Sequence, residues 1–261
     1  MIILFLGDVF GKAGRKIVIA KLSELKDEFS VDLCIANGEN LAQGRGMTEK
    51  TANAMFNAGV DVFTSGNHLW DRKESYEFIK NENRIVKPLN YPEQAIGNEY
   101  FVFDYDENCK VIIATLVGQA FMGAVNSPHQ CLEKRLASFY ELTKNIIIDF
   151  HAEATAEKRS FGFYFDGKVS AIIGTHTHIQ TADEEVLPQG SAYITDVGMT
   201  GPHDSIIGVE KEDIFRKIKT GMPVRYTVAS KGLQINAVVL DLDENSGKVR
   251  SIKRIKRKYD E

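Results

Sequence analysis

The sequence predicts an α/β fold. Short apolar runs rich in β-branched residues, the first of them at residues 2–6, have the length and composition of buried strands. Longer segments with apolar residues at helical spacing separate these runs, as at residues 16–29. Several apolar runs stop at a glycine followed by polar side chains, which is typical of strand ends that converge on one crevice in layered α/β proteins.

Composition bounds the class of protein. We expect the 261 residues to form one domain, 1–261, because no repeat, low-complexity tract or linker divides them. A hydrophobic fraction of 43% and a charged fraction of 26% are usual for soluble globular proteins. The formal net charge of -4 gives no overall attraction to nucleic acid or membranes, and no apolar run approaches the ~20 residues of a membrane span. Three scattered cysteines without CxxC spacing predict reduced thiols in a cytoplasmic protein.

The first half of the chain reads as three strand–helix units. The strand at 2–6 leads into a glycine-rich turn, in which Asp8 is either a metal ligand or a helix cap. Lys12 and Arg15 in the same turn could attract phosphate near the start of the next helix. Thr48 is a fair N-cap for the second helix. The predicted elements are strands at 2–6, 31–36 and 60–64 and helices at 16–29, 48–58 and 74–80.

The second half begins with an irregular connection at 84–98 and a hairpin. We expect a loop at 118–129, then alternating helices and strands, and an antiparallel meander at the end. The predicted strands are 99–105, 110–117, 146–149, 169–173, 193–195, 224–230, 232–243 and 248–258, and the predicted helices are 130–144, 154–164 and 213–219. The basic run at 253–258 could touch RNA, but an exposed edge strand protected by lysines is the more economical interpretation.

Ligand-type side chains gather at the predicted strand ends. The pair His176 and His178 follows the strand at 169–173, where Gly174 and Thr175 should end the strand and leave both imidazoles in a loop. Alone, such a pair is also compatible with two surface or hydrogen-bonded histidines. The other strand ends favour a shared site, because the same pattern recurs. The candidates are Asp8, Glu39, Asn40, Asn67, His68, His151, His176 and His178.

This set of side chains exceeds the needs of one tetrahedral zinc. Mixed oxygen and nitrogen ligands in this number suit two metal ions ~3.5–4 Å apart, bridged by a carboxylate. His129 and His203 lack ligand-like context and are expected outside the site. Glu153 is either close to the ligands or a helix-start carboxylate, and Asp196 could lie near the site.

The order and spacing of these residues resemble the calcineurin-like metallophosphoesterase superfamily, and more closely its bacterial YmdB-like subgroup. The motifs are Gly7-Asp8, Gly38-Glu39-Asn40, Gly66-Asn67-His68, His151 and Gly174-Thr-His176-Thr-His178, and they span most of the chain. Two features depart from the wider superfamily. Phe10 stands where a histidine is usual, and Glu39-Asn40 replaces a Gly-Asp pair with a bridging aspartate. Both departures agree with the YmdB-like subgroup.

The resemblance implies a four-layer α/β/β/α sandwich with mixed sheets that carries a dimetal site. By this likeness Asp8, Asn40 and His178 hold one metal ion, and Asn67, His151 and His176 hold the other. Glu39 bridges them and His68 is the general acid or transition-state stabiliser. Iron is the metal that the resemblance favours, with manganese or zinc as alternatives.

The implied activity is hydrolysis of cyclic nucleotides, of the 2′,3′-cyclic form and also the 3′,5′-cyclic form. A metal-activated hydroxide would attack phosphorus in line, while His68 donates a proton to the departing sugar oxygen. The partners expected are a small cyclic nucleotide or an RNA-derived phosphodiester, with no membrane and no stable nucleic-acid complex, and a second copy of the chain in a homo-oligomer. A phosphomonoesterase or nucleotidase with the same metals, and a regulatory sensor with little turnover, stay as alternatives.

Overall fold

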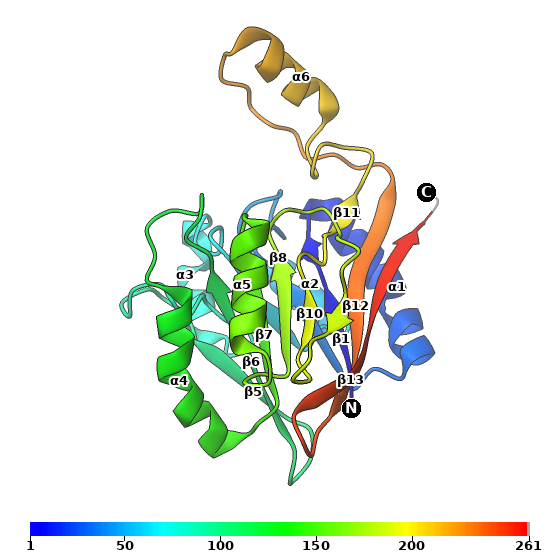
Figure 1. The fold of residues 1–261 in the computed structure, drawn as a ribbon. Coiled ribbons are helices and arrows are strands. Elements are labelled where there is room, and N and C mark those ends of the chain that lie inside the picture. The colour runs from blue at the N-terminus through cyan, green and yellow to red at the C-terminus, as the bar shows by residue number, and fades with distance from the viewer. Residues whose placement is uncertain (260–261) are drawn as a thin grey trace.

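The fold is a sandwich of two β-sheets with helices on both outer faces (Figure 1). The structure is a computed structural model, and it describes residues 1–259. Both sheets are mixed, because parallel strands in each are flanked by antiparallel ones. The four-layer α/β/β/α prediction is therefore confirmed.

The first sheet is built around the N-terminal strand. β1 (Ile2–Leu6) pairs parallel with β3 (Leu33–Asn37), which pairs parallel with β4 (Val62–Thr64). On its other side β1 pairs antiparallel with β12 (Leu233–Asp243). The sheet is completed by β2 (Asp8–Val9), β11 (Met199–Pro202) and β13 (Lys248–Lys258).

The second sheet has four neighbouring parallel strands at its centre. Their order places β7 (Ile146–His151) between β6 (Lys110–Val117) and β8 (Ala171–Thr175), followed by β10 (Ala192–Ile194). The two edges are antiparallel strands, β5 (Tyr100–Asp104) and β9 (Glu185–Val186).

Alternation along the strands explains how the layers pack. In β1, Leu4 and Leu6 belong to the core under the helices, whereas Ile3 and Phe5 belong to the core between the sheets. A strand buried on both faces must be apolar throughout, which is why these runs show no polar alternation. The first sheet is covered by α1 (Gly11–Phe29) and α2 (Glu49–Asn57), and the second by α4 (Pro128–Leu142) and α5 (Thr155–Phe165). A short η1 (Lys73–Ser75) and α3 (Tyr76–Asn81) follow β4.

Several element boundaries differ from the sequence prediction. The first helix begins at Gly11 rather than at residue 16, because the glycine-rich turn is itself helical and the amide of Gly11 donates to the carbonyl of Asn40. Asp8 is therefore not a helix cap; Phe10 occupies that position. β8 continues through Gly174 and Thr175, since the pairing with β7 extends to His151 and Thr175.

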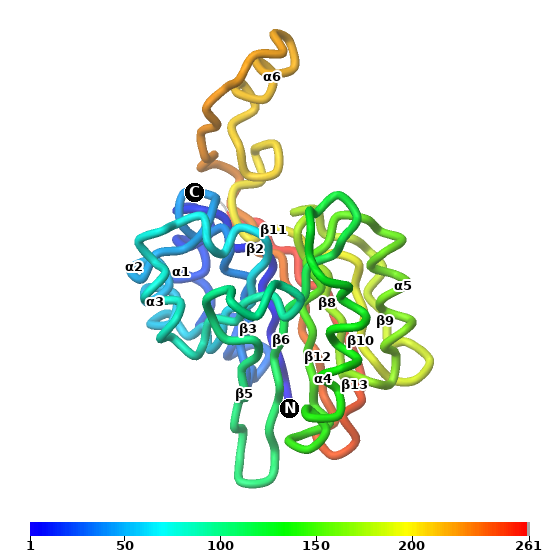
Figure 2. Tube along the Cα trace, turned by 90° about the vertical axis from the view of Figure 1, so that its left-hand side faces the viewer, coloured from blue at the N-terminus to red at the C-terminus, as the bar shows by residue number. Residues whose placement is uncertain are grey.

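The segment at 224–230 does not form the predicted strand. Its Val228 makes a single bridge to Val209, and the rest of the segment is irregular. It belongs to an arm, residues 203–230, that carries α6 (Lys211–Thr220) away from the sandwich. Figure 2 shows the arm rising beyond the edge of the two sheets. The basic run at the end of the chain lies on β13, an edge strand that pairs with β12 alone, as the economical interpretation predicted. Within residues 1–259, no helix combines the length and apolar character that crossing a bilayer requires.

Candidate metal centre

Three of the predicted ligands meet where β2, the loop after β3 and the loop after β8 converge. The Asn40 Nδ2 atom lies 3.3 Å from Asp8 Oδ1 and 3.3 Å from His178 Nε2. His178 Nε2 is 3.7 Å from Asp8 Oδ1. All three side chains are buried, so the sheet ends hold them in a small volume away from bulk water.

A second group forms beside the first, at the ends of β4, β7 and β8. His151 Nε2 lies 3.2 Å from Asn67 Oδ1 and 3.0 Å from His176 Nδ1. His151 is the last residue of β7, so its imidazole lies beside the loops that follow β4 and β8. The two loops bring Asn67 and His176 to the same point.

Glu39 contacts both groups. Its Oε1 atom lies 3.2 Å from His151 Nε2 and 3.4 Å from Asn40 Nδ2, while Oε2 accepts a hydrogen bond from the backbone amide of His68. Candidate ligand atoms of Glu39, His151 and His176 all lie within 4.8 Å of one another. The seven residues predicted as ligands thus form two groups of three with one shared carboxylate.

Burial and charge explain the protonation of this cluster. Burial raises the pKa of Asp8 above its ordinary value, an effect that the neighbouring His178 and His151 only partly offset. Burial acts in the same direction on Glu39, but the charge and hydrogen bond of His151 outweigh it and lower the pKa of Glu39 to about 2. Burial opposes the charge on His151, yet Glu39 raises the pKa of His151 to about 9. Burial and then the charge of His151 lower the pKa of His176 to about 3.

These donors fit a metal ion. Two buried carboxylates stand among neutral amide and imidazole groups, and a protonated His151 is a nearby cation that offsets them. A bound cation would supply this positive charge in place of the proton on His151. The imidazoles of His151 and His176 would then both be free to coordinate through nitrogen. A half-turn of the Asn40 amide would present its oxygen in place of its nitrogen without moving the rest of the side chain. Oxygen and imidazole ligands without thiolate suit iron, manganese or zinc.

The loop that carries the two histidines is strained. His176 has φ 100° and His178 has φ 66°, a region that non-glycine residues rarely occupy. Such a conformation costs about 1–3 kcal/mol per residue and persists only where surrounding contacts impose it. Here the amide of Thr177 donates to Asp196 Oδ2 at 3.0 Å, and the amide of His176 faces Asp8 Oδ2 at 3.3 Å.

A buried ion pair fixes Asp196 beneath this loop. Lys158 Nζ, on the inner face of α5, lies 2.7 Å from Asp196 Oδ2 and donates to the carbonyl of Thr175 at 2.7 Å. Both charged side chains are buried. Asp196 therefore supports the histidine loop from below rather than lining the site. The sequence holds a signal for Lys158, because it shares the apolar face of its helix with Phe161 and Phe165.

The opposite side of His151 is held by a polar chain. Its Nδ1 lies 2.8 Å from Thr175 Oγ1, and that hydroxyl donates to Asp149 Oδ1 at 2.6 Å. Burial raises the pKa of Asp149 to about 6. These contacts fix the ring of His151 so that its Nε2 faces Glu39, Asn67 and His176.

His68 lies beside the two groups rather than within them. Its side chain is 23% exposed, its Nδ1 lies 3.0 Å from Asp71 Oδ2, and its Nε2 lies 3.4 Å from Asn67 Nδ2. Arg45 Nε contacts the same Asp71 Oδ2 at 2.9 Å. Asp71 and Arg45 are not among the predicted site residues, because neither directly follows a strand.

A cleft of about 390 Å³ opens onto the cluster. Glu153 lines it and lies 3.2 Å from His176 Nε2, so it is close to the proposed ligands and is not merely a helix-start carboxylate. Phe10, Ile207 and Tyr226 form an apolar side of the cleft. The Ile207 carbonyl lies 2.9 Å from His178 Nδ1 and orients that ring. His129, packed among aromatic rings, and His203, bonded to the Met199 carbonyl, stand apart from the cluster.

The four-layer sandwich, with oxygen and nitrogen donors gathered at its strand ends, defines a protein of the metallophosphoesterase class. More particularly, the chain belongs to the family of YmdB-like proteins, whose family model matches residues 4–255. A Bacillus subtilis (strain 168) protein named 2′,3′-cyclic-nucleotide 2′-phosphodiesterase is 43% identical over 255 residues, which cover 98% of this chain and 96% of that protein.

Solved structures agree with this assignment. A novel phosphatase from Mycoplasma pneumoniae superposes with a TM-score of 0.94 at 37% identity, covering 100% of this chain and 94% of that one. A hypothetical protein from Thermus thermophilus superposes with a TM-score of 0.93 at 35% identity, covering 100% of both chains. Membership of the family and the site geometry together indicate that the protein uses metal.

Replacing Lys158 should remove the support of the histidine loop. Lys158→Met keeps the side-chain length but leaves Asp196 as a buried carboxylate without its cation, and we expect the free energy of unfolding to fall by about 3–5 kcal/mol. Chemical denaturation followed by circular dichroism measures this. Lys21→Met, which removes the exposed pair with Glu24, is the control and should change little. An unchanged midpoint for Lys158→Met would contradict the role given to the ion pair.

Proposed function

We propose that the protein is a dimetal phosphodiesterase that hydrolyses 2′,3′-cyclic nucleotides, and also accepts 3′,5′-cyclic ones. The observation that carries the proposal is the pair of three-residue donor groups that share Glu39 at the floor of an open cleft. The name of the Bacillus subtilis relative supports the same substrate class.

In this proposal the first group holds one metal ion and the second group holds the other, with Glu39 between them. The first consists of Asp8, Asn40 and His178, and the second of Asn67, His151 and His176. Iron is the metal we propose, since neutral nitrogen and oxygen donors dominate the set, with manganese or zinc as alternatives. When bound, the metals would supply Lewis acidity toward the phosphoryl group and an activated water.

The chain itself would supply the proton for the leaving group. His68 reaches the cleft beside Asn67, and Asp71 at 3.0 Å holds its Nδ1. This contact leaves Nε2 as the atom that faces the departing sugar oxygen. Arg45, on the same rim, adds positive charge where a phosphate would approach.

The first test is turnover of 2′,3′-cyclic AMP by metal-reconstituted protein beside Glu39→Gln. The substitution removes the shared charge while keeping the shape, so we expect loss of both metal occupancy and hydrolysis, measured by elemental analysis and product formation. A monoester, 3′-AMP, is assayed in parallel. Faster turnover of the monoester would favour the phosphatase alternative, and nucleotide binding without hydrolysis at full metal occupancy would favour the sensor.

His68→Ala tests the general acid. We expect turnover to fall by about 10²-fold or more, with metal content unchanged, because proton donation is lost while the proposed ligands stay in place. Asp71→Asn keeps the ring in place but weakens its orientation, and should give a smaller loss in kcat with little change in KM. Full activity of His68→Ala would remove the histidine from the mechanism.

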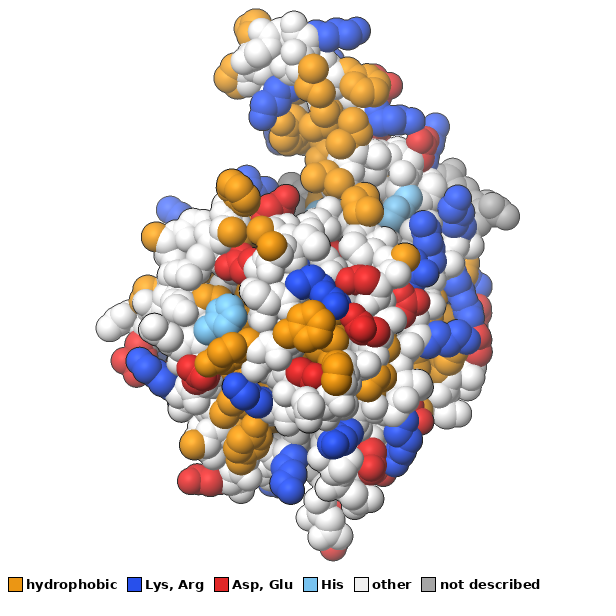
Figure 3. All heavy atoms as spheres, viewed as in Figure 1, with side chains coloured by type: hydrophobic (Ala, Val, Ile, Leu, Met, Phe, Trp, Pro, Cys, Tyr) orange, Lys and Arg blue, Asp and Glu red, His pale blue; other side chains and the backbone are white. Residues whose placement is uncertain are grey.

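We also propose that the chain forms a homo-oligomer through its arm. α6 buries no residue; Phe215 and Ile218 are exposed along it, Ile218 by 75%, and Met222 is exposed just after its end. Figure 3 shows apolar side chains gathered on the arm. A helix of this length is marginal in water without packing partners. Its first turn is acidic and its last turn is basic, so a second copy running antiparallel would match charge with charge.

The arm is tested by analytical ultracentrifugation. Ile218→Glu introduces charge into the apolar stripe, and we expect it to convert the oligomer to a smaller species while the sandwich stays folded, as near-UV circular dichroism can show. Ser23→Glu, at an exposed position on α1, adds the same single negative charge and serves as the control. A wild-type protein that sediments as a monomer would contradict this proposal.

We further propose that the protein works in the cytoplasm, where Cys34, Cys109 and Cys131 would stay reduced, which cell fractionation can check.

A further inference from the structure

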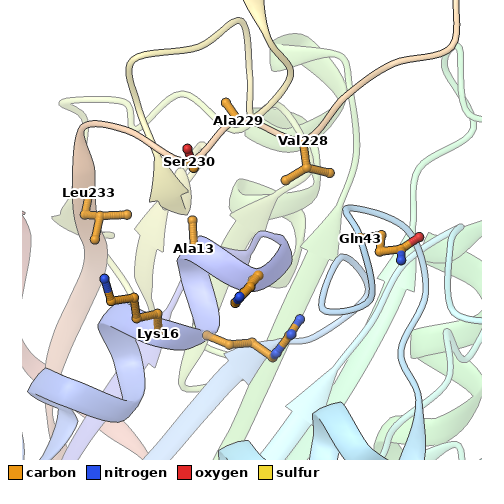
Figure 4. A pocket seen from close by; sticks show the side chains of 9 residues that line it. Ala13, Lys16, Gln43, Val228, Ala229, Ser230 and Leu233 are labelled. Atoms are coloured by element: carbon orange, nitrogen blue, oxygen red, sulfur yellow. The ribbon is translucent and has the colours of Figure 1, made fainter.

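A second cavity, of about 500 Å³, lies beside the start of α1 (Figure 4). One wall comes from the first turns of that helix, with Ala13 and Lys16. A second wall is the segment in which the arm returns to the sandwich, with Val228, Ala229 and Ser230, and Gln43 lies on the loop opposite. This cavity takes no part in the proposed hydrolysis.

Its charge is one-sided. Lys12, Arg15 and Lys16 line it, and none of its described lining residues is acidic. Lys12 and Lys16 are exposed, whereas Arg15 is half-buried and its guanidinium also donates to the carbonyl of Leu41. Three cations around a hollow of this size, on a chain whose net charge is -4, form a local site for an anion.

The cavity adjoins the cleft over the proposed metal centre. Three separate segments of the chain line both hollows. In the first, Phe10 borders the cleft and Lys12 borders the cavity. In the same way, Gly44 and Tyr226 border the cleft, and their neighbours Gln43 and Val228 border the cavity. An offset of one or two residues spans at most ~7 Å of extended chain. The two hollows are therefore neighbours, and the ring of Phe10, which lines the cleft, lies against Gly44 and Gly208.

The chemistry of the substrate says what lies next to a cyclic phosphate. A 2′,3′-cyclic phosphate needs a ribose 2′-hydroxyl, so it arises at the 3′ end of a fragment when RNA is cleaved. On a fragment longer than one nucleotide, the neighbouring group along the strand is a phosphodiester anion. Hydrolysis breaks the bond from phosphorus to O2′; the oxygen of water joins phosphorus and a proton goes to O2′, so the rest of the strand is untouched.

We propose that this cavity binds a backbone phosphate of a short RNA fragment whose terminal cyclic phosphate lies in the cleft. The substrate class is then an oligonucleotide end in addition to a free mononucleotide. This rests on the proposed phosphodiesterase activity and refines it. Lys12 and Lys16 bind as mobile point charges, which carry no base preference. Such a contact is electrostatic and weakens as the salt concentration rises.

The experiment compares two substrates at several salt concentrations. We measure kcat/KM for 2′,3′-cyclic AMP and for an adenylate trinucleotide ending in a 2′,3′-cyclic phosphate. The wild-type enzyme should prefer the trinucleotide. For this substrate the slope of log kcat/KM against log salt concentration should be steeper than for 2′,3′-cyclic AMP by about 0.7 for each backbone phosphate bound. The double substitution Lys12→Gln with Lys16→Gln should lower the ratio of the two kcat/KM values by about tenfold, equivalent to the loss of ~1.4 kcal/mol.

The matched control is Lys253→Gln with Lys256→Gln on the basic edge strand β13, and it should leave that ratio unchanged. Equal kcat/KM for the two substrates in the wild type, or an equal loss in the control pair, would overturn this inference while leaving the phosphodiesterase intact. Failure of the wild type to hydrolyse either substrate, with metal bound, would overturn both proposals together.

Discussion

The arrangement of the site depends on one buried carboxylate. Glu39 Oε1 lies 3.2 Å from His151 Nε2 and 3.4 Å from Asn40 Nδ2, so this one side chain contacts both donor groups. A carboxylate is stable in such a place only if cations or hydrogen-bond donors surround it, because desolvation of an unpaired charge is very costly. The chain meets this demand with the protonated ring of His151 and the backbone amide of His68. The same demand makes the site a receptor for metal, which supplies positive charge without requiring a proton on a ligating nitrogen.

The residues that support this cluster come from different layers of the fold and lie far apart in the sequence. Lys158 comes from a helix on the outer face of the second sheet, and Asp196 from the loop after β10, yet this pair contacts the backbone of Thr175 and Thr177, the neighbours of His176 and His178. His176 and His178 keep their positive φ angles because these contacts hold the loop in that conformation. The strained loop and the buried ion pair therefore act together to hold the imidazoles of His176 and His178 close to each other.

Much of this was predictable from the sequence, and the limits have physical causes. The strand ends were predictable because a strand buried on both faces must be apolar, so that Asp8, Asn40 or His151 marks the point where the apolar run ends, although all three side chains are themselves buried. The start of α1 was predicted five residues late, since glycines that indicate a turn also fit the first helical turn when a carbonyl from elsewhere, here that of Asn40, accepts the amide of Gly11. Asp71 and Arg45 were missed because their role comes from a contact across a loop, which spacing alone does not encode.

The arm was the hardest part to predict. The helix in it was expected, but the segment at 224–230 has strand-like residues without a partner to pair with, apart from the bridge of Val228 to Val209. β-propensity is realised only where a neighbouring strand offers hydrogen bonds and a face to pack on. The base of the arm instead supplies Ile207, whose carbonyl orients His178, together with Val228, which lies in the wall of the basic cavity. The base of the arm thus borders both hollows and contacts the imidazole of His178, and its two halves are joined by backbone hydrogen bonds from Glu210 to Thr227 and from Ala229 to Gly208.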